Sequence, residues 1–340
     1  MTRALRQNGP RPLEGIIVLD FSRVLSGPHA TRILTDLGAD VIKVEPPTGD
    51  LTRFTNPRVN SLSTYFIQQN TGKRNISVDL DKPAARVLMT RLAEKVDVVV
   101  ENFSSGVMAK MGLDYPSLAK TNPRLVYVSI TGFGADGPWA TRKAYAPVIN
   151  AESGLTKSQG DARGGVYAND PHSHGDVYTG MYAAMGALAA LHQRHITGHG
   201  QFVDVSMAES MLYANEHAHD ALWDREPPMG VTRSFRPGDY PVLTAANGEM
   251  AVATGHPAEN GTFDFFVAAM SAPHLAEDPR FIDQASRLAN LEELQRLIRS
   301  WAATCANFSE LAEKLTANRI PIGRLQSTSD LAGSDWSKSR

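Results

Sequence analysis

Residues 15–45, GIIVLDFSRVLSGPHATRILTDLGADVIKVE, decide the fold class of the first half of the chain. The apolar run at 15–20 predicts a buried strand, and residues 30–37 predict a helix that ends before Gly38. Residues 41–45 predict a second strand, which Pro46 stops. Strands separated by a helix form a βαβ unit, in which the two strands are parallel. The stretch therefore predicts a parallel sheet.

The same alternation continues along the chain. Short runs rich in β-branched residues predict further strands at 75–80, 96–100, 125–130 and 201–206. Helical patterns lie at 83–94, 117–120, 177–194 and 207–223. No GxGxxG or Walker A pattern follows the first strand, which argues against the common dinucleotide and nucleoside-triphosphate sites. The segment Ser22–Pro28 stands where a parallel sheet places a ligand-binding loop, although an ordinary turn would use the same residue types.

A second domain is expected after residue 224. The composition shifts at Arg225-Glu226-Pro227-Pro228, and the stretch 225–239 has the prolines and glycines of a linker or crossover. Beyond it, Asn247-Gly248 between two short apolar runs is typical of a hairpin, and helical patterns follow at 291–304 and 309–315. We therefore expect an α/β protein with a Rossmann-like large domain (1–224), a linker (225–239), a smaller α+β domain (240–328) and a C-terminal tail (329–340).

Composition excludes several classes of protein. Among 340 residues, 34 Lys+Arg stand against 36 Asp+Glu, so no basic surface for nucleic acid or a membrane is expected. The single cysteine, Cys305, excludes an intramolecular disulfide framework. No run approaches the roughly 18–20 apolar residues of a membrane span. Residues 1–12 are polar and basic without the apolar core of a signal peptide, so we expect a cytoplasmic protein.

The densest polar segment, Asn169–Asp176, contains the candidate chemistry. Asp176 directly precedes the helix predicted from Val177, where aspartate commonly serves as an N-cap. The same helix-terminal amides would also keep the carboxylate ionised, and an ionised carboxylate can attack an activated acyl group. The residue pattern alone leaves the structural and the nucleophilic interpretation open.

The same segment also has the H-x-H-x-D spacing of hydrolytic zinc sites, in His172, His174 and Asp176. The familiar motif continues with another histidine, and this chain has Val177 there. His217 and His219 lie two apart on a predicted helix, so their side chains point apart. A metallohydrolase is therefore the least favoured interpretation, and we expect no metal.

A series of motifs, in order along the chain, resembles the class III coenzyme A transferases of the CaiB/BaiF type. It comprises residues 12–20, 26–28, 37–45, 49–53, 70–80, 100–103, 129–134, 175–176 and 197–206. The resemblance covers some 200 residues and continues weakly to about residue 325. It implies the fold of that family: a Rossmann-like, CoA-binding large domain with a parallel sheet and a small α+β domain.

The family resemblance also implies an activity. An acyl-CoA and a small carboxylic acid would be the substrates, and no metal would take part. The aspartate matching Asp176 attacks the thioester and forms a mixed anhydride, after which CoA attacks the aspartyl carbonyl to give an enzyme thioester. The acceptor carboxylate then reacts with the enzyme thioester, and CoA leaves carrying the new acyl group. Family members form interlocked homodimers, so a homodimer is expected here.

Ten further residues match positions at the CoA pocket of the family. They are Val24, Leu25, Ser26, Lys73, Asn102, Phe103, Lys110, Met111, Lys143 and Tyr145. Aromatic and thioether side chains suit the adenine ring and lysines suit the phosphates, but the same residue types also occur as ordinary core and surface.

Two other activities remain open. The family includes acyl-CoA racemases, whose catalytic histidine lies about thirty residues before the aspartate; Tyr145 stands there, and a tyrosine with its ordinary pKa near 10 is a poor base. The transferase is therefore favoured over the racemase, and a truncated, non-catalytic CoA-binding relative is the other alternative.

Two departures from the family pattern bear on specificity and assembly. Thr232–Gly238 replaces the glycine-rich loop of formyl-CoA transferases, which favours a carnitine-type or other organic-acid acceptor over formyl or oxalyl groups. Family members continue for some tens of residues that return to the large domain, whereas this sequence ends at Arg340. The expected dimer and full activity would both depend on that return segment.

Overall fold

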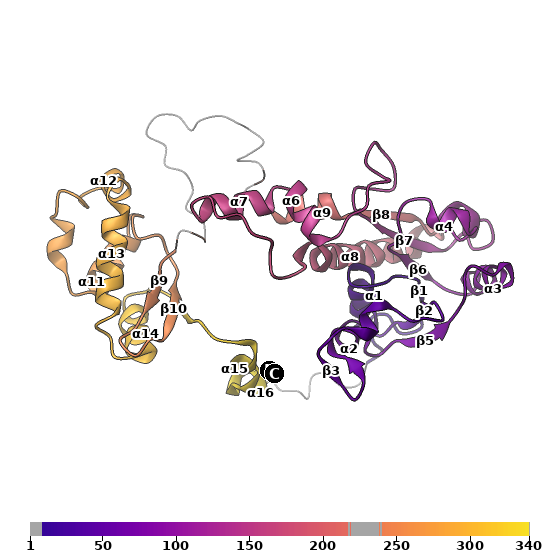
Figure 1. Cartoon of the computed structure of the whole chain (residues 1–340), viewed down its shortest axis with the longest axis horizontal. Coiled ribbons are helices and arrows are strands. Elements are labelled where there is room, and N and C mark those ends of the chain that lie inside the picture. The colour runs from indigo at the N-terminus through magenta and orange to yellow at the C-terminus, as the bar shows by residue number, and fades with distance from the viewer. Residues whose placement is uncertain (1–8, 217, 219–237, 239, 340) are drawn as a thin grey trace. The chain divides into compact units, whose positions relative to one another are not determined.

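The computed structural model describes residues 9–216, 218, 238 and 240–339. The chain divides into two compact units, Met1–Asp224 and Arg225–Arg340 (Figure 1). The predicted linker at 225–239 lies almost wholly outside the described residues. Within the described part, no helix is both long enough and apolar enough to cross a membrane.

The large unit is built on a parallel sheet of six strands, as the sequence predicted. The strand order is β5-β2-β1-β6-β7-β8, and every neighbouring pair is parallel. The strands are β1 (Ile17–Asp20), β2 (Asp40–Glu45), β5 (Arg74–Ser77), β6 (Val98–Glu101), β7 (Val126–Thr131) and β8 (Phe202–Ser206). A small antiparallel hairpin, β3 (Arg58–Val59) and β4 (Leu62–Ser63), lies outside this sheet.

Helices cover both faces of the sheet, and this explains why its central strands are continuous apolar runs. All residues of β6 and β7 are buried. One core joins β6 and β7 to α1 and α8, whereas the other joins the same strands to α3 and α4 (Figure 1). The α-helices of this unit are α1 (Ser26–Asp36), α2 (Thr64–Asn70), α3 (Pro83–Ala93), α4 (Val107–Lys110), α5 (Tyr115–Leu118), α6 (Ala146–Glu152), α7 (Leu155–Ala162), α8 (His174–Thr197) and α9 (Met207–Ala214). A 3-10 turn, η2, spans Leu51–Phe54.

Helix α8 begins three residues earlier than the sequence pattern predicted. Its N-cap is Ser173, so Asp176 is the third helical residue and the expected N-cap role of Asp176 is wrong. The predicted helix at 207–223 is helical over Met207–Ala214, and residues 219–223 fall outside the described part. The small residues of α8 allow a close approach to α1, because a Cβ on Gly180 would lie 2.6 Å from the carbonyl oxygen of Ser26.

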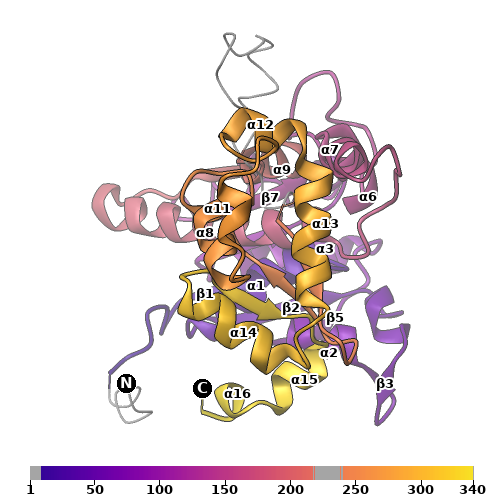
Figure 2. The same ribbon diagram turned by 90° about the vertical axis from the view of Figure 1, so that its left-hand side faces the viewer.

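The smaller unit is an α+β assembly with a three-stranded antiparallel sheet. The predicted hairpin is confirmed: β9 (Val242–Thr244) pairs with β10 (Met250–Ala253), and Gly248 in the turn has φ +86°. The third strand is β11 (Ile322–Arg324), and the helices are α11 (Thr262–Ala269), α12 (Gln284–Ala289), α13 (Leu291–Ala302), α14 (Phe308–Ala317), α15 (Thr328–Gly333) and α16 (Asp335–Ser339), with a 3-10 turn η4 (Pro273–Ala276). Figure 2 shows α11, α13 and α14 of this unit facing the viewer, and their apolar sides form its core. Helices α15 and α16 occupy the predicted tail.

Candidate active site

The loop after β1 is anchored by buried charges. Asp20, the last residue of β1, is fully buried, and its carboxylate accepts hydrogen bonds from the Ser22 amide at 2.9 Å and the Thr31 hydroxyl at 2.6 Å. Lys73 Nζ lies 3.1 Å from Asp20 Oδ2. Burial alone would raise the pKa of Asp20, but Lys73, Lys43 and the hydrogen bonds from Ser22 and Thr31 together lower it. The carboxylate is therefore ionised and fixes the start of the loop.

Lys73 holds the loop after β1 through three buried hydrogen bonds. Its side chain is 1 % exposed, and Nζ donates to Asp20, to the carbonyl of Pro28 at 2.9 Å and to Asn70 Oδ1 at 3.0 Å. Burial lowers the pKa of Lys73 to about 8, with Asp20 opposing the change. All three N–H donors of Lys73 are thus used inside the protein, which indicates that this lysine has a structural role. Contact between Lys73 and a phosphate of CoA stays a prediction that this geometry does not favour.

A second buried ion pair holds the middle of the loop in a strained conformation. Val24 has φ +66°, a region that a β-branched residue rarely adopts. Its amide donates to Asp50 Oδ2 at 3.2 Å, and Lys43 Nζ lies 3.2 Å from the same carboxylate. Backbone strain of this kind persists only where the surroundings fix it, and it is common at functional sites.

Asn102, at the carboxyl end of β6, clamps the same loop from the other side. Its Oδ1 accepts from the Arg23 amide at 2.8 Å, and its Nδ2 donates to the Arg23 carbonyl at 2.8 Å and to Ser26 Oγ at 3.2 Å. The Arg23 guanidinium lies 4.9 Å from the centre of the Phe103 ring. The Phe103 amide in turn donates to Glu101, whose pKa burial raises to about 7. The structure therefore brings Val24, Ser26, Asn102 and Phe103 together.

The remaining residues that the family resemblance indicated lie around this loop or on the surface. Leu25 is 4 % exposed at the N-cap of α1. Met111 is half-buried against the core under β6, whereas Lys110, the last residue of α4, is exposed. Lys143 is exposed, and Tyr145, 68 % exposed, is the N-cap of α6. The exposed lysines and Tyr145 are available to a ligand.

Asp176 lies where the first turns of α1, α6 and α8 meet. The hydroxyl and amide of Ser26 and the amide of Ala146 are near enough to its carboxylate to lower its pKa. The N-terminal turn of α6 is close by, because a Cβ on Gly175 would lie 3.3 Å from Ala146 Cα. Burial raises the pKa of Asp176 to about 6, and the three donors limit the increase. The carboxylate is therefore mostly ionised at neutral pH although it is poorly solvated.

Sequence reasoning missed three groups near this carboxylate. The Tyr65 phenol on α2 interacts electrostatically with Asp176, and burial, Asp176 and Asp50 together raise the pKa of Tyr65 to about 12. Among the described residues, the buried Asn150 Oδ1 has no hydrogen-bond partner, and it would lie 3.1 Å from a Cβ on Gly175. The Ala146 amide was missed as well. None of these has a local sequence signal, because their proximity to Asp176 arises from the fold.

The histidines of the H-x-H-x-D pattern form a separate cluster. His174 Nδ1 bonds the Asp170 carboxylate, and the His174 ring stacks on Tyr178 with a centroid distance of 5.7 Å. Two positions apart on α8, His174 and Asp176 point in different directions. Throughout the described part of the chain, no three His, Cys, Asp or Glu side chains are arranged to hold a metal ion.

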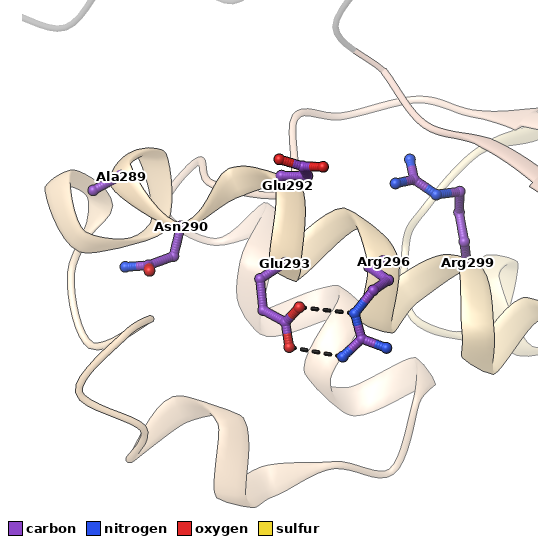
Figure 3. Close-up of a pocket in the computed structure, with 6 residues that line it drawn as sticks. All are labelled: Ala289, Asn290, Glu292, Glu293, Arg296 and Arg299. Carbon is purple, nitrogen blue, oxygen red and sulfur yellow. Dashed lines mark hydrogen bonds and ion pairs between the residues drawn. The ribbon is translucent and has the colours of Figure 1, made fainter.

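The structure has two surface hollows that Asp176 does not line. One, of about 450 Å³, borders the outward face of α6 at Pro147, Val148, Ala151 and Glu152. The other, of about 350 Å³, belongs to the smaller unit and is lined by Ala289, Asn290, Glu292, Glu293, Arg296 and Arg299 (Figure 3). There Arg296 and Glu293 form a paired ion bridge, at 2.8 and 2.7 Å, so much of the charge is already neutralised.

The fold agrees with what comparisons with known proteins show. The chain belongs to CoA-transferase family III, whose model matches residues 13–340, and this confirms the resemblance found in the sequence. It is 37% identical over 331 residues to a succinyl-CoA:mesaconate CoA-transferase of Haloarcula hispanica, covering 94% of this chain and 81% of that protein. It is 36% identical over 342 residues to a formyl-CoA:oxalate CoA-transferase of Streptomyces avermitilis, covering 94% and 82%. The crystal structure of a CAIB/BAIF family protein from Brucella suis has a TM-score of 0.83 and 32% identity, covering 98% of this chain and 88% of that one.

Proposed function

We propose that this family III enzyme moves CoA from an acyl-CoA donor to a carboxylic-acid acceptor, with Asp176 as the covalent nucleophile. The observation that carries the proposal is the environment of Asp176: a poorly solvated carboxylate, ionised at neutral pH, beside the loop that Asn102 and Asp50 hold. A carboxylate with few waters to shed is a better nucleophile than one in bulk solvent.

The reaction would proceed through two anhydrides and one thioester. An Asp176 oxygen attacks the acyl carbonyl, the C–S bond breaks, and CoA thiolate leaves. The thiolate attacks the aspartyl carbonyl, and the donor acid leaves with one aspartyl oxygen. The acceptor carboxylate then attacks the enzyme thioester and releases thiolate again. Attack of this thiolate on the acceptor carbonyl gives the new acyl-CoA and restores the Asp176 carboxylate.

The polar groups near Asp176 suit the second step of this reaction, in which the thiolate attacks the aspartyl carbonyl. When thiolate attacks the aspartyl carbonyl, negative charge develops on an aspartyl oxygen. The amides of Ser26 and Ala146 already favour the charged form of that carboxyl group, so they would stabilise the developing charge as well. The thioester energy is kept at each step, and no step requires a metal.

CoA would bind along the loop after β1 and the turn after β6. Phe103 and Met111 offer apolar surface for the adenine ring, and Lys110 and Lys143 are exposed for the phosphates. Because the Arg23 guanidinium lies over the Phe103 ring, it adds a charge beside that surface. The strained Val24 and the buried Leu25 would line the path to Asp176.

The acceptor is proposed to be a small dicarboxylic acid. The two relatives described above are named for mesaconate and oxalate, each of which carries two carboxylates. We also propose a cytoplasmic homodimer, as expected from the sequence and the family. The residues that replace the family's glycine-rich loop, Thr232–Gly238, lie outside the described residues apart from Gly238, so the acceptor preference expected from them stays a prediction.

The test is mass spectrometry of the intact protein after incubation with a panel of acyl-CoAs, including succinyl-CoA, acetyl-CoA and a carnitine-type ester. The proposal predicts a CoA or acyl adduct in the wild type and in Asp36→Ala, and none in Asp176→Ala. Asp36 is a matched control because it is an exposed carboxylate on α1, paired with Arg32 at 2.9 Å. CoA binding without any adduct would contradict the proposal and favour a non-catalytic relative. Deuterium exchange at the substrate α-carbon without an adduct would favour the racemase.

A further inference from the structure

Arg23, in the loop after β1, is a half-buried cation whose N–H groups have no protein partner. Its Nε is enclosed by the protein and donates to nothing, and neither of its Nη atoms bonds another described residue. The guanidinium does lie 4.9 Å from the centre of the Phe103 ring. Arg23 is not one of the ten pocket residues that the family resemblance indicated, although it directly precedes three of them.

Other arginines of this chain that lie over aromatic rings also bond an oxygen atom. Arg53 lies 3.9 Å from the centre of the Phe66 ring and donates twice to Glu45, at 2.6 and 2.7 Å. Arg142 lies over two rings and pairs with Glu152. An aromatic face attracts the charge of a guanidinium but uses none of its five N–H groups. The ring contact in the loop after β1 therefore leaves the donors of that guanidinium unexplained.

The backbone on both sides of Arg23 is fixed by other side chains. Asn102 accepts from the Arg23 amide and donates to the Arg23 carbonyl, both at 2.8 Å. The carbonyl of Ser22 accepts from Lys43 Nζ at 2.8 Å, and the amide of the next residue along donates to Asp50 at 3.2 Å. The direction in which the Arg23 side chain leaves the backbone is thus set before any ligand binds, and such preorganisation favours binding.

The charge of Arg23 is also not balanced by a neighbouring acid. The two acids that anchor this loop, Asp20 and Asp50, are each paired with a buried lysine, Lys73 and Lys43 respectively. No carboxylate in the described part of the chain pairs with Arg23. A held, half-buried guanidinium with unused donors favours an anion, and its planar fork matches two oxygens of a phosphate at once.

We propose that Arg23 binds a phosphate group in the nucleotide half of CoA and so makes the enzyme select CoA by its nucleotide as well as by its thioester. The inference rests on the proposed CoA site and adds to it a residue that determines specificity. Phe103 offers the apolar surface proposed for adenine, and the phosphates of CoA are attached to the ribose of the same nucleoside. A guanidinium beside that ring lies where such a phosphate would come, whether the 3′-phosphate or the diphosphate at the 5′ carbon.

The test is a calorimetric titration of the full chain with CoA, which needs no turnover. In Arg23→Gln, CoA should bind about 10- to 100-fold more weakly, because the charge-assisted bonds to one phosphate are lost. Arg23→Lys keeps the charge without the planar fork and should recover part of that loss. Arg91→Gln is the control for the loss of one positive charge, because Arg91 is exposed in the last turn of α3. Its affinity for CoA should equal that of the wild type.

Two further titrations identify the phosphate and separate the charge of Arg23 from the shape of the loop. If the loss in Arg23→Gln disappears with dephospho-CoA, which lacks the 3′-phosphate, Arg23 binds that group; if the loss persists, Arg23 binds the diphosphate. Raising the salt concentration from about 20 to about 200 mM should weaken CoA binding more in the wild type than in Arg23→Gln, since salt screens the charge that this variant lacks.

Equal affinity of the wild type and Arg23→Gln for CoA would overturn the proposal. A loss that is just as large in Arg23→Lys, with the salt dependence of the wild type, would overturn it too, because only the shape of the loop would then have changed. If Arg23→Gln does not fold, Arg23→Lys should still bind CoA severalfold more weakly than the wild type, and an unchanged affinity would contradict the role of Arg23. CoA binding without any adduct in the wild type would contradict the proposed catalysis, whereas the affinities would still decide the role of Arg23.

Discussion

Replacing Gly180 with alanine should loosen the contact between α1 and α8 and slow the chemistry at Asp176. The new Cβ would lie 2.6 Å from the backbone oxygen of Ser26, far inside normal van der Waals contact. Because that oxygen belongs to the backbone of a packed helix, it cannot rotate away as a side chain would. The two helices must move apart by a fraction of an ångström or more.

Two opposing effects determine how much Gly180→Ala changes the free energy of unfolding. Overpacking of a close contact costs about 1–3 kcal/mol. Alanine stabilises a helix interior by about 1 kcal/mol relative to glycine. We therefore expect a net loss of about 1 kcal/mol, and more if the helices separate poorly. Gly186→Ala is the matched control on the same helix, because its Cβ would meet only a methyl of Val203, at 2.8 Å, which can rotate. In Gly186→Ala the cost of overpacking and the gain in helix propensity should roughly cancel, so the free energy of unfolding should change little.

Hydrogen exchange of peptides from α1 and α8 is the suitable assay for Gly180→Ala, since a chain with two compact units need not unfold in a single step. A loss of 1–2 kcal/mol corresponds to exchange about 5- to 30-fold faster where opening is global. The rate of adduct formation should fall in the same variant. Unchanged exchange and an unchanged rate in Gly180→Ala would refute the close contact between Ser26 and α8 on which this reasoning depends.

Three other predictions concern charge and close packing in the large unit. The pKa of Asp176 is raised from 3.8 to about 6 in the folded protein, so ionisation of this carboxyl group lowers the stability of the fold as pH rises from 4 to 6. Asp176→Asn should therefore be more stable than the wild type above pH 6, and this gain should fade toward pH 4. Thermal unfolding that shows an equal gain at every pH would contradict the prediction. Lys73→Ala leaves the buried carboxylate of Asp20 without its partner and should cost about 3–5 kcal/mol in urea unfolding, whereas a change below 1 kcal/mol would mean that water replaces the lysine. Gly200→Ala would place a Cβ 2.0 Å from the Leu125 carbonyl oxygen and should prevent β8 from pairing normally with β7, so a melting temperature equal to the wild type's would show that this turn relaxes freely.

The strands were the most predictable part of the fold. All six strands of the parallel sheet were expected within a few residues of their observed bounds, because fully buried strands are continuous apolar runs with polar or turn residues at their ends. The hairpin at Asn247-Gly248 followed from a local preference, since a glycine accepts the positive φ of that turn. The order β5-β2-β1-β6-β7-β8 has no local signal and depends on how helices cross the sheet.

The start of α8 shows why helix bounds are harder to predict. The segment before Val177 has no apolar periodicity, and the N-cap Ser173 has φ −84° and ψ 57° without a side-chain cap bond. Polar residues such as His174 therefore enter the helix without a sequence signal, and Asp176 becomes an internal residue of the first turn. The polar groups that lower its pKa belong to Ser26 and Ala146 on other helices. An N-cap would instead accept hydrogen bonds from the amides of its own helix.

Candidate site residues could be named from the resemblance, but their roles depend on contacts between distant segments. Lys73 looked like a free cation in the sequence, and the fold buries it against Asp20. Tyr65 had no signal at all, yet it lies within electrostatic reach of Asp176. Ser26 was expected to line a pocket, and its Oγ accepts a hydrogen bond from Asn102 Nδ2. Sequence patterns indicate which residues have the right chemistry, whereas packing decides what each one touches.

Transfer of oxygen from the acceptor to Asp176 would test the central claim most directly. The enzyme is incubated with the acyl-CoA that gives an adduct and with an acceptor acid labelled with oxygen-18 in its carboxylate. The mass of the peptide containing Asp176 is then measured by mass spectrometry. In the proposed sequence the oxygen that bridges the second anhydride stays on the enzyme, so the label should accumulate in Asp176. Turnover to the labelled acyl-CoA with no label in that peptide would show that the acceptor receives CoA without a covalent Asp176 intermediate.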